Sequence, residues 1–142
     1  MEILNTSIFY KPDFSFTSLD GSVTYTVSGN LSTEFYLYMM ETQNYISYIE
    51  AEERKAVDYY NNFSEEQKTP TEFKKVMDIK TSDMAAISKR LKEFALKLIQ
   101  LDKSKSGLTM ETVNEQFNNF ETLLLLFGKV ISMLQEKVNN PN

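Results

Sequence analysis

The chain has 142 residues and a net charge of -5, and it contains neither cysteine nor histidine. Without cysteine it can form no disulfide and no thiolate metal site. Without histidine it lacks the commonest general base and the commonest metal ligand. Nucleic-acid binding depends on Lys and Arg neutralising phosphates, and the acidic balance opposes it. The composition therefore predicts no enzyme activity, no catalytic, cofactor or metal site, and no nucleic-acid partner.

The length fits a single domain over residues 1–142, with a β-sheet region at 1–29 and a helical region at 30–142. Only 3 prolines and 4 glycines interrupt the chain, which favours long helices. The longest purely apolar run, at 123–127, is far shorter than the roughly 20 residues of a membrane span. The amino terminus has no basic stretch followed by an apolar one. We expect a cytoplasmic protein, without a membrane partner.

Two runs of alternating large and small residues, at 14–17 and 23–27, flank Asp20-Gly21. Asp-Gly between alternating runs is the strongest short-range signal for a β-hairpin. A two-residue loop there sets Phe16 opposite Tyr25, and the large side chains of both strands then share one face. Residues 3–10 also alternate and predict a third strand.

Apolar residues spaced by threes and fours predict a helix from about 31 to 60, either continuous or divided near Asn44. A linker follows near 61–71. The run at 69–72 reads Thr-Pro-Thr-Glu, a capping box with Pro at the first helical position. It predicts a short helix ending near Lys80. The run at 81–83 is expected to cap a further helix, which ends near Leu101.

Thr109 is expected to cap a last helix that continues to residue 138. Its apolar residues alternate at spacings of three and four, which is a heptad seam: Met110, Val113, Phe117, Phe120, Leu124, Phe127, Ile131, Leu134 and Val138. The predicted fold is therefore α+β and mostly α, with a small N-terminal antiparallel β-hairpin or sheet packed against a bundle of about four helices.

Three leucines of the last helix, Leu123, Leu125 and Leu126, point away from this seam. A helix that is apolar all round is buried on all sides, either within its own core or against a second copy or a partner. Gly128 in the same helix predicts close approach by another backbone, since glycine inside a helix costs about 1 kcal/mol.

The tyrosines of the first helix form a second feature, because tyrosine is common at protein interfaces. They belong either to the rim of an amphipathic helix on the sheet or to an interface. The predicted partner-binding residues are Leu123, Leu125, Leu126, Gly128, Tyr38, Tyr45 and Tyr48.

The order of elements resembles a known family. A strand region Phe-x-x-Leu-Asp-Gly-Ser-Val-x-Tyr-x-Val at 16–27 leads through Gly-Asn-Leu-Ser at 29–32 into helices. The segments at 91–99 and 121–131 add to the pattern, which is similar to tail assembly chaperones of long-tailed phages and prophages of Gram-positive hosts. The resemblance implies a non-enzymatic protein that self-associates and coats the tape measure protein during assembly of the tail tube.

Two other functions stay open from the sequence. One is a small phage-encoded inhibitor, such as an anti-defence protein, that acts by binding a host protein. The other is a metal-dependent enzyme using carboxylates. A very long coiled-coil reading frame downstream, with a slippery sequence near the codons for 138–142, would support the chaperone.

Overall fold

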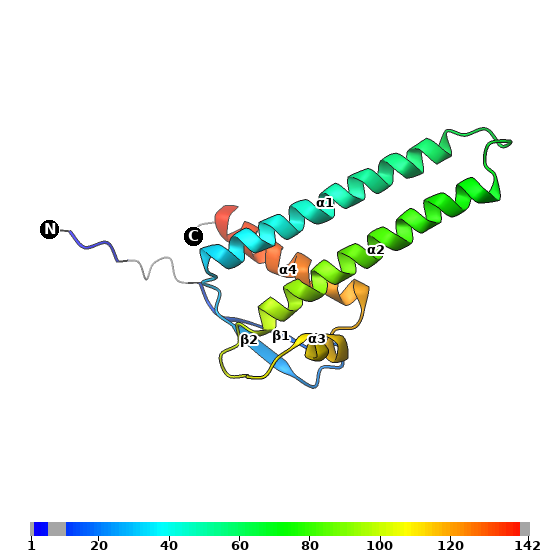
Figure 1. The fold of residues 1–142 in the computed structure, drawn as a ribbon. Coiled ribbons are helices and arrows are strands. Elements are labelled where there is room, and N and C mark those ends of the chain that lie inside the picture. Colours follow the sequence, from blue (N-terminus) through cyan, green and yellow to red (C-terminus); the bar gives the residue numbers. More distant parts are fainter. Residues whose placement is uncertain (1, 6–10, 140–142) are drawn as a thin grey trace.

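The computed structural model describes residues 2–5 and 11–139, and their side chains up to residue 133. It confirms a mostly helical fold with a small antiparallel sheet (Figure 1). The described residues form two strands and four helices: β1 (Phe14–Thr17), β2 (Thr24–Val27), α1 (Thr33–Asn61), α2 (Pro70–Ile99), α3 (Met110–Gln116) and α4 (Phe120–Asn139).

The predicted hairpin is confirmed in its register. Phe16 pairs with Tyr25 and Phe14 with Val27. Gly21 has φ +76, a left-handed conformation that glycine adopts without steric cost. Asp20 stabilises the turn by accepting hydrogen bonds from the backbone and the hydroxyl of Ser22. The expected third strand falls partly on residues 6–10, which lie outside the described residues, and residues 2–5 form no strand.

The first two helices form a long antiparallel pair. Ser32 caps α1, which continues unbroken past Asn44, so the continuous alternative is confirmed. The prediction of two helices at 70–80 and 81–101 is wrong, because α2 is one helix. Thr69 caps its start as expected. The hydroxyl of Thr81, however, donates to the carbonyl of Met77 one turn earlier, and therefore does not begin a new helix.

The prediction of one helix from 110 to 138 is also wrong. The chain leaves the helix at Phe117, and α4 begins at Phe120. Asn119 causes this break, because its side-chain oxygen accepts hydrogen bonds from the backbone N–H and the hydroxyl of Thr122. An asparagine that caps a new helix competes with continuation of the old one.

The core lies where the sheet, α3 and α4 pack against one half of the long helix pair (Figure 1). Phe94 of α2 occupies its centre, since its ring contacts Phe35 of α1 and Phe127 of α4. Tyr25 of the sheet packs against Phe117, and its hydroxyl donates to Gln116. In the described part of the chain, no helix is long and apolar enough to cross a membrane.

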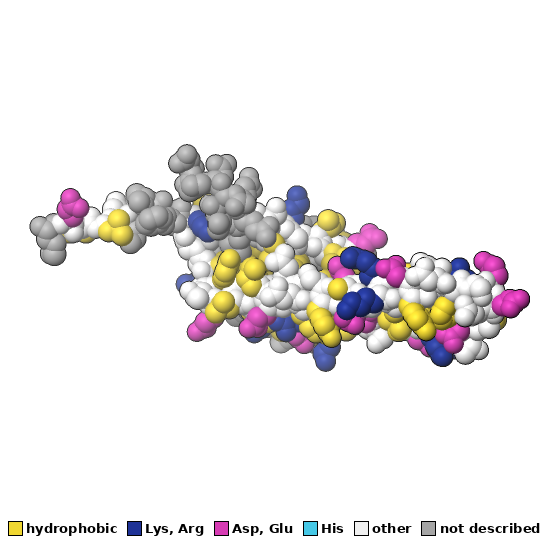
Figure 2. Space-filling model, turned by 90° about the horizontal axis from the view of Figure 1, so that it is seen from above, with side chains coloured by type: hydrophobic (Ala, Val, Ile, Leu, Met, Phe, Trp, Pro, Cys, Tyr) yellow, Lys and Arg dark blue, Asp and Glu magenta, His cyan; other side chains and the backbone are white. Residues whose placement is uncertain are grey.

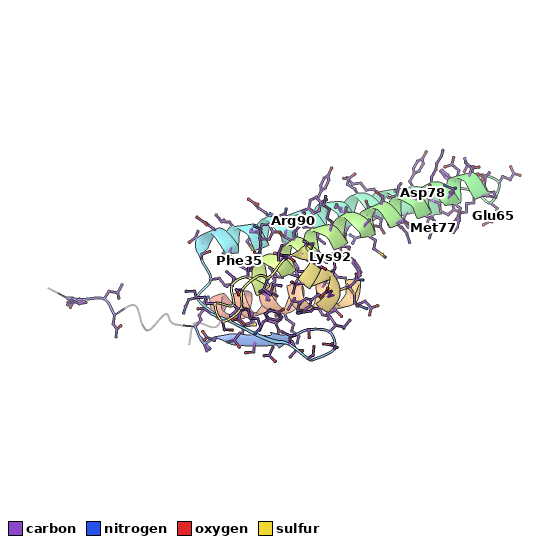
Figure 3. The ribbon with its side chains drawn as sticks, turned by 60° about the horizontal axis from the view of Figure 1, so that its bottom comes forward. Phe35, Glu65, Met77, Asp78, Arg90 and Lys92 are labelled. Carbon is purple, nitrogen blue, oxygen red and sulfur yellow. The ribbon has the colours of Figure 1, made fainter. Side chains whose placement is uncertain are left out.

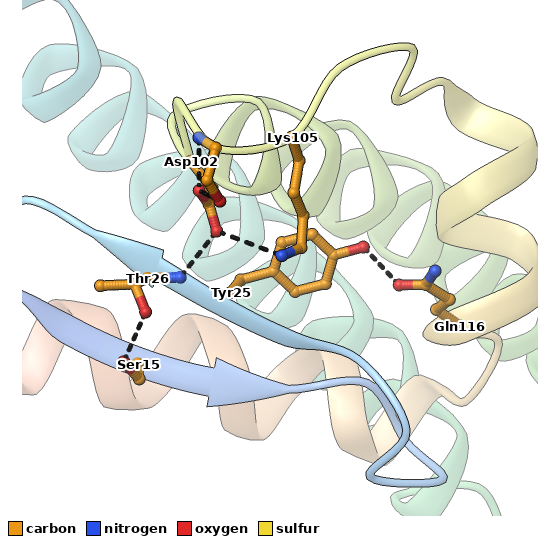
Figure 4. A network of polar contacts seen from close by, with 7 residues as sticks. Ser15, Tyr25, Thr26, Asp102, Lys105 and Gln116 are labelled. Carbon is orange, nitrogen blue, oxygen red and sulfur yellow. Dashed lines mark hydrogen bonds and ion pairs between the residues drawn. The ribbon is translucent and has the colours of Figure 1, made fainter.

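A buried carboxylate connects the sheet to the end of α2. Asp102 is 3% exposed and accepts hydrogen bonds from the backbone N–H of Thr26 at 2.8 Å and the hydroxyl of Ser104 at 2.6 Å (Figure 4). The backbone N–H of Ser104 donates to it as well, and Lys105 lies 3.7 Å away. The bond from Ser104 and then that from Thr26 lower the pKa of Asp102 from 3.8 to about 2.

This pKa predicts how acid affects stability. A lowered folded-state pKa stabilises the protein above pH 3.8, and this contribution is lost as the pH falls from about 4 through about 2. We expect Asp102→Asn to unfold at lower urea concentration than the wild type at pH 7, and to lose less stability between pH 4 and pH 2. Urea midpoints at both pH values measure this.

Asp58→Asn is the matched control, because Asp58 is exposed and its carboxylate makes no hydrogen bond or ion pair among the described residues. An acid dependence reduced as much by Asp58→Asn as by Asp102→Asn would contradict the role given to the buried carboxylate.

Candidate protein-binding arm

Half of the long helix pair extends beyond the core as a two-helix arm, residues 47–86 (Figure 1). It comprises the end of α1, the linker and the first half of α2. No residue of the arm is buried. The core residues Ile46 and Ile87, which directly precede and follow the arm in the sequence, are both buried. The apolar residues between the two helices, such as Ile49 and Val76, are only partly covered. The arm is therefore a single layer of two helices, and no third element of the described chain covers either face.

An apolar stripe on α2 passes from the core onto this arm. Met77, Met84, Leu91 and Leu98 lie seven residues apart, so they share one face of the helix. Leu91 and Leu98 are fully buried, because other elements pack on that part of α2. Met84 and Met77 are 55% and 42% exposed. The same helix face is thus core at one end of α2 and uncovered surface at the other.

Phe73 extends the uncovered part of this stripe by one turn and is itself half exposed. We call Phe73, Met77 and Met84 the arm face; Figure 3 shows Met77 on the arm, well beyond the core end of α2 marked by Arg90 and Lys92. Methionine is flexible and polarisable and adapts to differently shaped partners. The arm face therefore has the chemistry of a surface that accepts an apolar helix face.

Aromatic contacts fix the tip of the arm. The ring of Tyr60 in α1 lies 5.9 Å from that of Phe63 and 6.2 Å from that of Phe73 in α2. The Nζ of Lys68 also lies over the Tyr60 ring, 5.8 Å from its centre. These contacts join both helices across the linker, so the arm face is presented by a closed hairpin.

Charged side chains of both signs surround the apolar ones on the arm surface (Figure 2). The arm has nine acidic and six basic residues. Three ion pairs are formed within single helices, such as Lys74 with Asp78 at 2.9 Å. Exposed pairs of this kind contribute little to stability, about 0–1 kcal/mol. The arm is therefore held together by its partly covered seam and by the aromatic tip.

The partner-binding leucines predicted on α4 differ in how exposed they are. Leu125 is 66% exposed and Leu126 is half-buried, so both reach the surface. Leu123 is 1% exposed and belongs to the core, which corrects its assignment to a partner surface. The reason is that α4 starts anew at Phe120. Its buried stripe keeps Phe127 and Ile131 of the predicted seam but passes through Leu123 instead of Leu124.

Gly128 does not bring another backbone close. A Cβ atom built at this position would meet no atom of the described chain within 4 Å, and the residue is exposed. The expected close approach is therefore absent from this structure. Gly128 and Leu125 lie on the surface of α4, far along the chain from the arm.

The three predicted tyrosines all belong to α1, but only Tyr48 lies on the arm, where it is 66% exposed. Tyr45 is 41% exposed, and Tyr38 is half-buried at the core end of the helix. Arg90 of α2 lies over both the Tyr38 and Tyr45 rings. Tyr38 and Tyr45 thus form a cluster with α2, separate from Tyr48.

The hydroxyl of Tyr38 is buried and has no hydrogen-bond partner among the described residues. The side chain of Thr42 is close enough to act on the pKa of Tyr38 and lower it, but the two hydroxyls do not form a hydrogen bond of normal geometry. The hydroxyl of Thr42 donates to the Tyr38 carbonyl and accepts from Arg90. Burial is the main cause that raises the pKa of Tyr38, and the charge of Arg90 acts in the opposite direction.

We expect Tyr38→Phe to stabilise the protein by about 1 kcal/mol, because a buried unpaired hydroxyl costs about 1–3 kcal/mol and phenylalanine keeps the ring. Chemical denaturation at pH 7 measures the change. Tyr48→Phe is the control, and we expect no change for this exposed hydroxyl. A loss of stability in Tyr38→Phe would show that the hydroxyl is satisfied in solution.

Among the described residues, no group of three or more acidic side chains could hold a metal ion. Comparison with models of known protein families, with curated proteins and with solved structures finds no match to this chain.

Proposed function

We propose that this protein is a non-enzymatic assembly chaperone that binds helical segments of a partner along its arm, and that the partner is a phage tape measure protein during assembly of the tail tube. The resemblance at 16–32, 91–99 and 121–131 supports the identity of the partner. The arm supports the mode of binding. A helix pair with uncovered apolar residues can accept an amphipathic helix as a third element.

One observation carries the proposal: the stripe of α2 that is fully buried at Leu91 and Leu98 is exposed at Met84 and Met77. Exposed large apolar residues scattered singly are normal on a protein surface. Here they continue a core stripe with the same seven-residue spacing. A third helix would complete the packing of the arm face as α4 and its neighbours complete the packing at the core end.

Co-expression with the tape measure protein of the same phage or prophage tests the function. We expect a tagged tape measure protein to be soluble in the presence of this chain and to retain it through affinity purification and size exclusion. The elongated, coiled-coil character of that partner suits binding of many copies along its length. Light scattering of the purified complex gives the number of copies.

A tape measure protein whose solubility does not change, and from which the chain separates on size exclusion, would overturn the chaperone function. A host enzyme retained in its place, and inhibited by the purified chain, would establish the anti-defence inhibitor instead.

A further inference from the structure

Leu125 is a large apolar side chain on the outer face of α4. It is 66% exposed, whereas Leu123 and Phe127, on the opposite side of the helix, are buried. A single exposed leucine is normal on a protein surface and does not by itself indicate a partner. Leu125 differs from an isolated leucine in its neighbours, because an acid lies one turn before it and a base lies one turn after it.

The acid is Glu121 and the base is Lys129, and with Leu125 they form one ridge, since residues four apart are neighbours on a helix surface. Both charged side chains are exposed, and neither forms an ion pair with a described residue. The eight residues between them correspond to about 12 Å along the helix axis, which keeps them from pairing with each other. Both charges are therefore available to another molecule.

The order of charges on this ridge is complementary to itself when the ridge is reversed. In a contact with two-fold symmetry, each residue meets its counterpart from the other copy across the axis. An axis beside Leu125, with the two helices antiparallel, sets Leu125 against its own copy and Glu121 against Lys129 at both ends. Every charge then faces an opposite charge. A parallel pair would instead set Glu121 against Glu121 and Lys129 against Lys129.

The surface beside the ridge is open to close approach. A Cβ atom built at Gly128 would meet no atom of the described chain within 4 Å. Ser132, one turn later, is also small and exposed. Rows of residues four apart interdigitate in the commonest class of helix packing. Gly128 and Ser132 therefore leave room beside the ridge for the ridge of a second helix.

We propose that the protein forms a symmetric dimer in which α4 packs antiparallel against α4 of a second copy, through the ridge Glu121, Leu125 and Lys129. A second copy is the occupant because the ridge itself supplies both halves of the charge pairing. The dimer does not depend on the proposed function. Since α4 runs away from the arm (Figure 1), the dimer leaves two arms uncovered, and each remains able to bind a partner.

Charge reversal tests the pairing, with sedimentation equilibrium of the full chain as the measurement. We expect the wild type to dimerise reversibly with increasing concentration. Glu121→Lys alone and Lys129→Glu alone should each weaken the dimer by about tenfold or more, because like charges then face each other at both ends of the contact. A mixture of these two variants should associate as tightly as the wild type, because each reversed charge then faces an opposite charge on the other variant.

Substitution of the central leucine tests the apolar part of the contact. Leu125→Asp should weaken the dimer by about a hundredfold, because two like charges then meet at its centre. Leu37→Asp is the matched control, since Leu37 of α1 is similarly exposed, at 54%, and lies outside the ridge. We expect at most a few-fold change from the control. The thermal midpoint and circular dichroism of each variant show that the fold is intact.

The outcomes separate this dimer from the helix-binding arm. A wild type that stays monomeric at every concentration would overturn the dimer without affecting the proposed function. Single variants that associate no better when mixed than alone, or equal losses in Leu125→Asp and Leu37→Asp, would show that the ridge is not the contact. Loss of the dimer in Met77→Asp combined with Met84→Asp, but not in Leu125→Asp, would place self-association on the arm face and overturn the contact through α4.

Discussion

Met77→Asp combined with Met84→Asp should weaken binding of the tape measure protein by about a hundredfold or more while the chain stays folded. Both side chains lie on the arm face and are half exposed, so the free protein tolerates the charges. In the complex the same positions are covered. An unpaired charge in a covered apolar contact costs several kcal/mol, and each 1.4 kcal/mol is a factor of ten in affinity. Titration of the purified proteins by calorimetry or anisotropy measures the loss.

The matched control adds the same two charges to the same helix outside the arm face. Thr71→Asp with Ser82→Asp serves this purpose, because both residues are exposed and neither belongs to the apolar stripe. We expect at most a few-fold change in affinity from the control. Equal losses in the two double variants would mean that general repulsion, rather than contact with the arm face, weakens the complex.

Leu91→Ala should destabilise the free protein by about 3 kcal/mol, whereas Met84→Ala should cost less than about 1 kcal/mol. The two residues are seven positions apart on one face of α2 and differ in cover: Leu91 is fully buried and Met84 is 55% exposed. Removing a buried leucine side chain leaves a cavity, while an exposed side chain leaves none. Domains of this size are stable by only about 5–15 kcal/mol, so the first loss is easily measured by denaturation.

Self-association changes this comparison in a defined way. If the arm face is covered by a second copy at high protein concentration, the cost of Met84→Ala should rise with concentration, while that of Leu91→Ala should not. A cost of Met84→Ala above about 2 kcal/mol at every concentration would mean that the residue is buried in the free chain, contrary to the structure.

The sequence predicted those elements whose signals are local. The hairpin register followed from Asp20-Gly21 and from side-chain alternation, because the side-chain period of a strand leaves only one pairing with the large residues on one face. The cap at Thr69 was equally visible. The errors came at Thr81 and Asn119, since a Thr or Asn side chain can either cap a helix or lie within one. Tertiary packing decides which of these outcomes occurs, and the sequence of a single segment does not show how that segment packs against the rest of the chain.

The arm could not be predicted for a related reason. The residues at Met77 and Met84 have the same pattern as Leu91 and Leu98, and periodicity indicates which face is apolar but not whether anything covers it. Coverage depends on how far along α2 the neighbouring elements reach, and α4 begins beside the middle of α2 and runs away from the arm (Figure 1). One feature of the sequence does distinguish the uncovered part of the stripe: the stripe has leucine within the core and methionine on the arm. The contacts of Arg90 with Thr42, Tyr38 and Tyr45 could not be predicted either, because those residues belong to a different helix.

The hydrogen bonds between the hairpin and the carboxyl-terminal half affect the order in which the chain can fold during synthesis. The hairpin leaves the ribosome first, yet its anchors are Asp102 and Gln116, and Gln116 also accepts from the backbone of Leu19. Translation adds about 5–20 residues per second, so the hairpin waits several seconds for its anchors. The arm, a local pair of helices joined by a short linker, can close during that interval. In the nascent chain the surface proposed to bind the partner is therefore complete before the core beneath it.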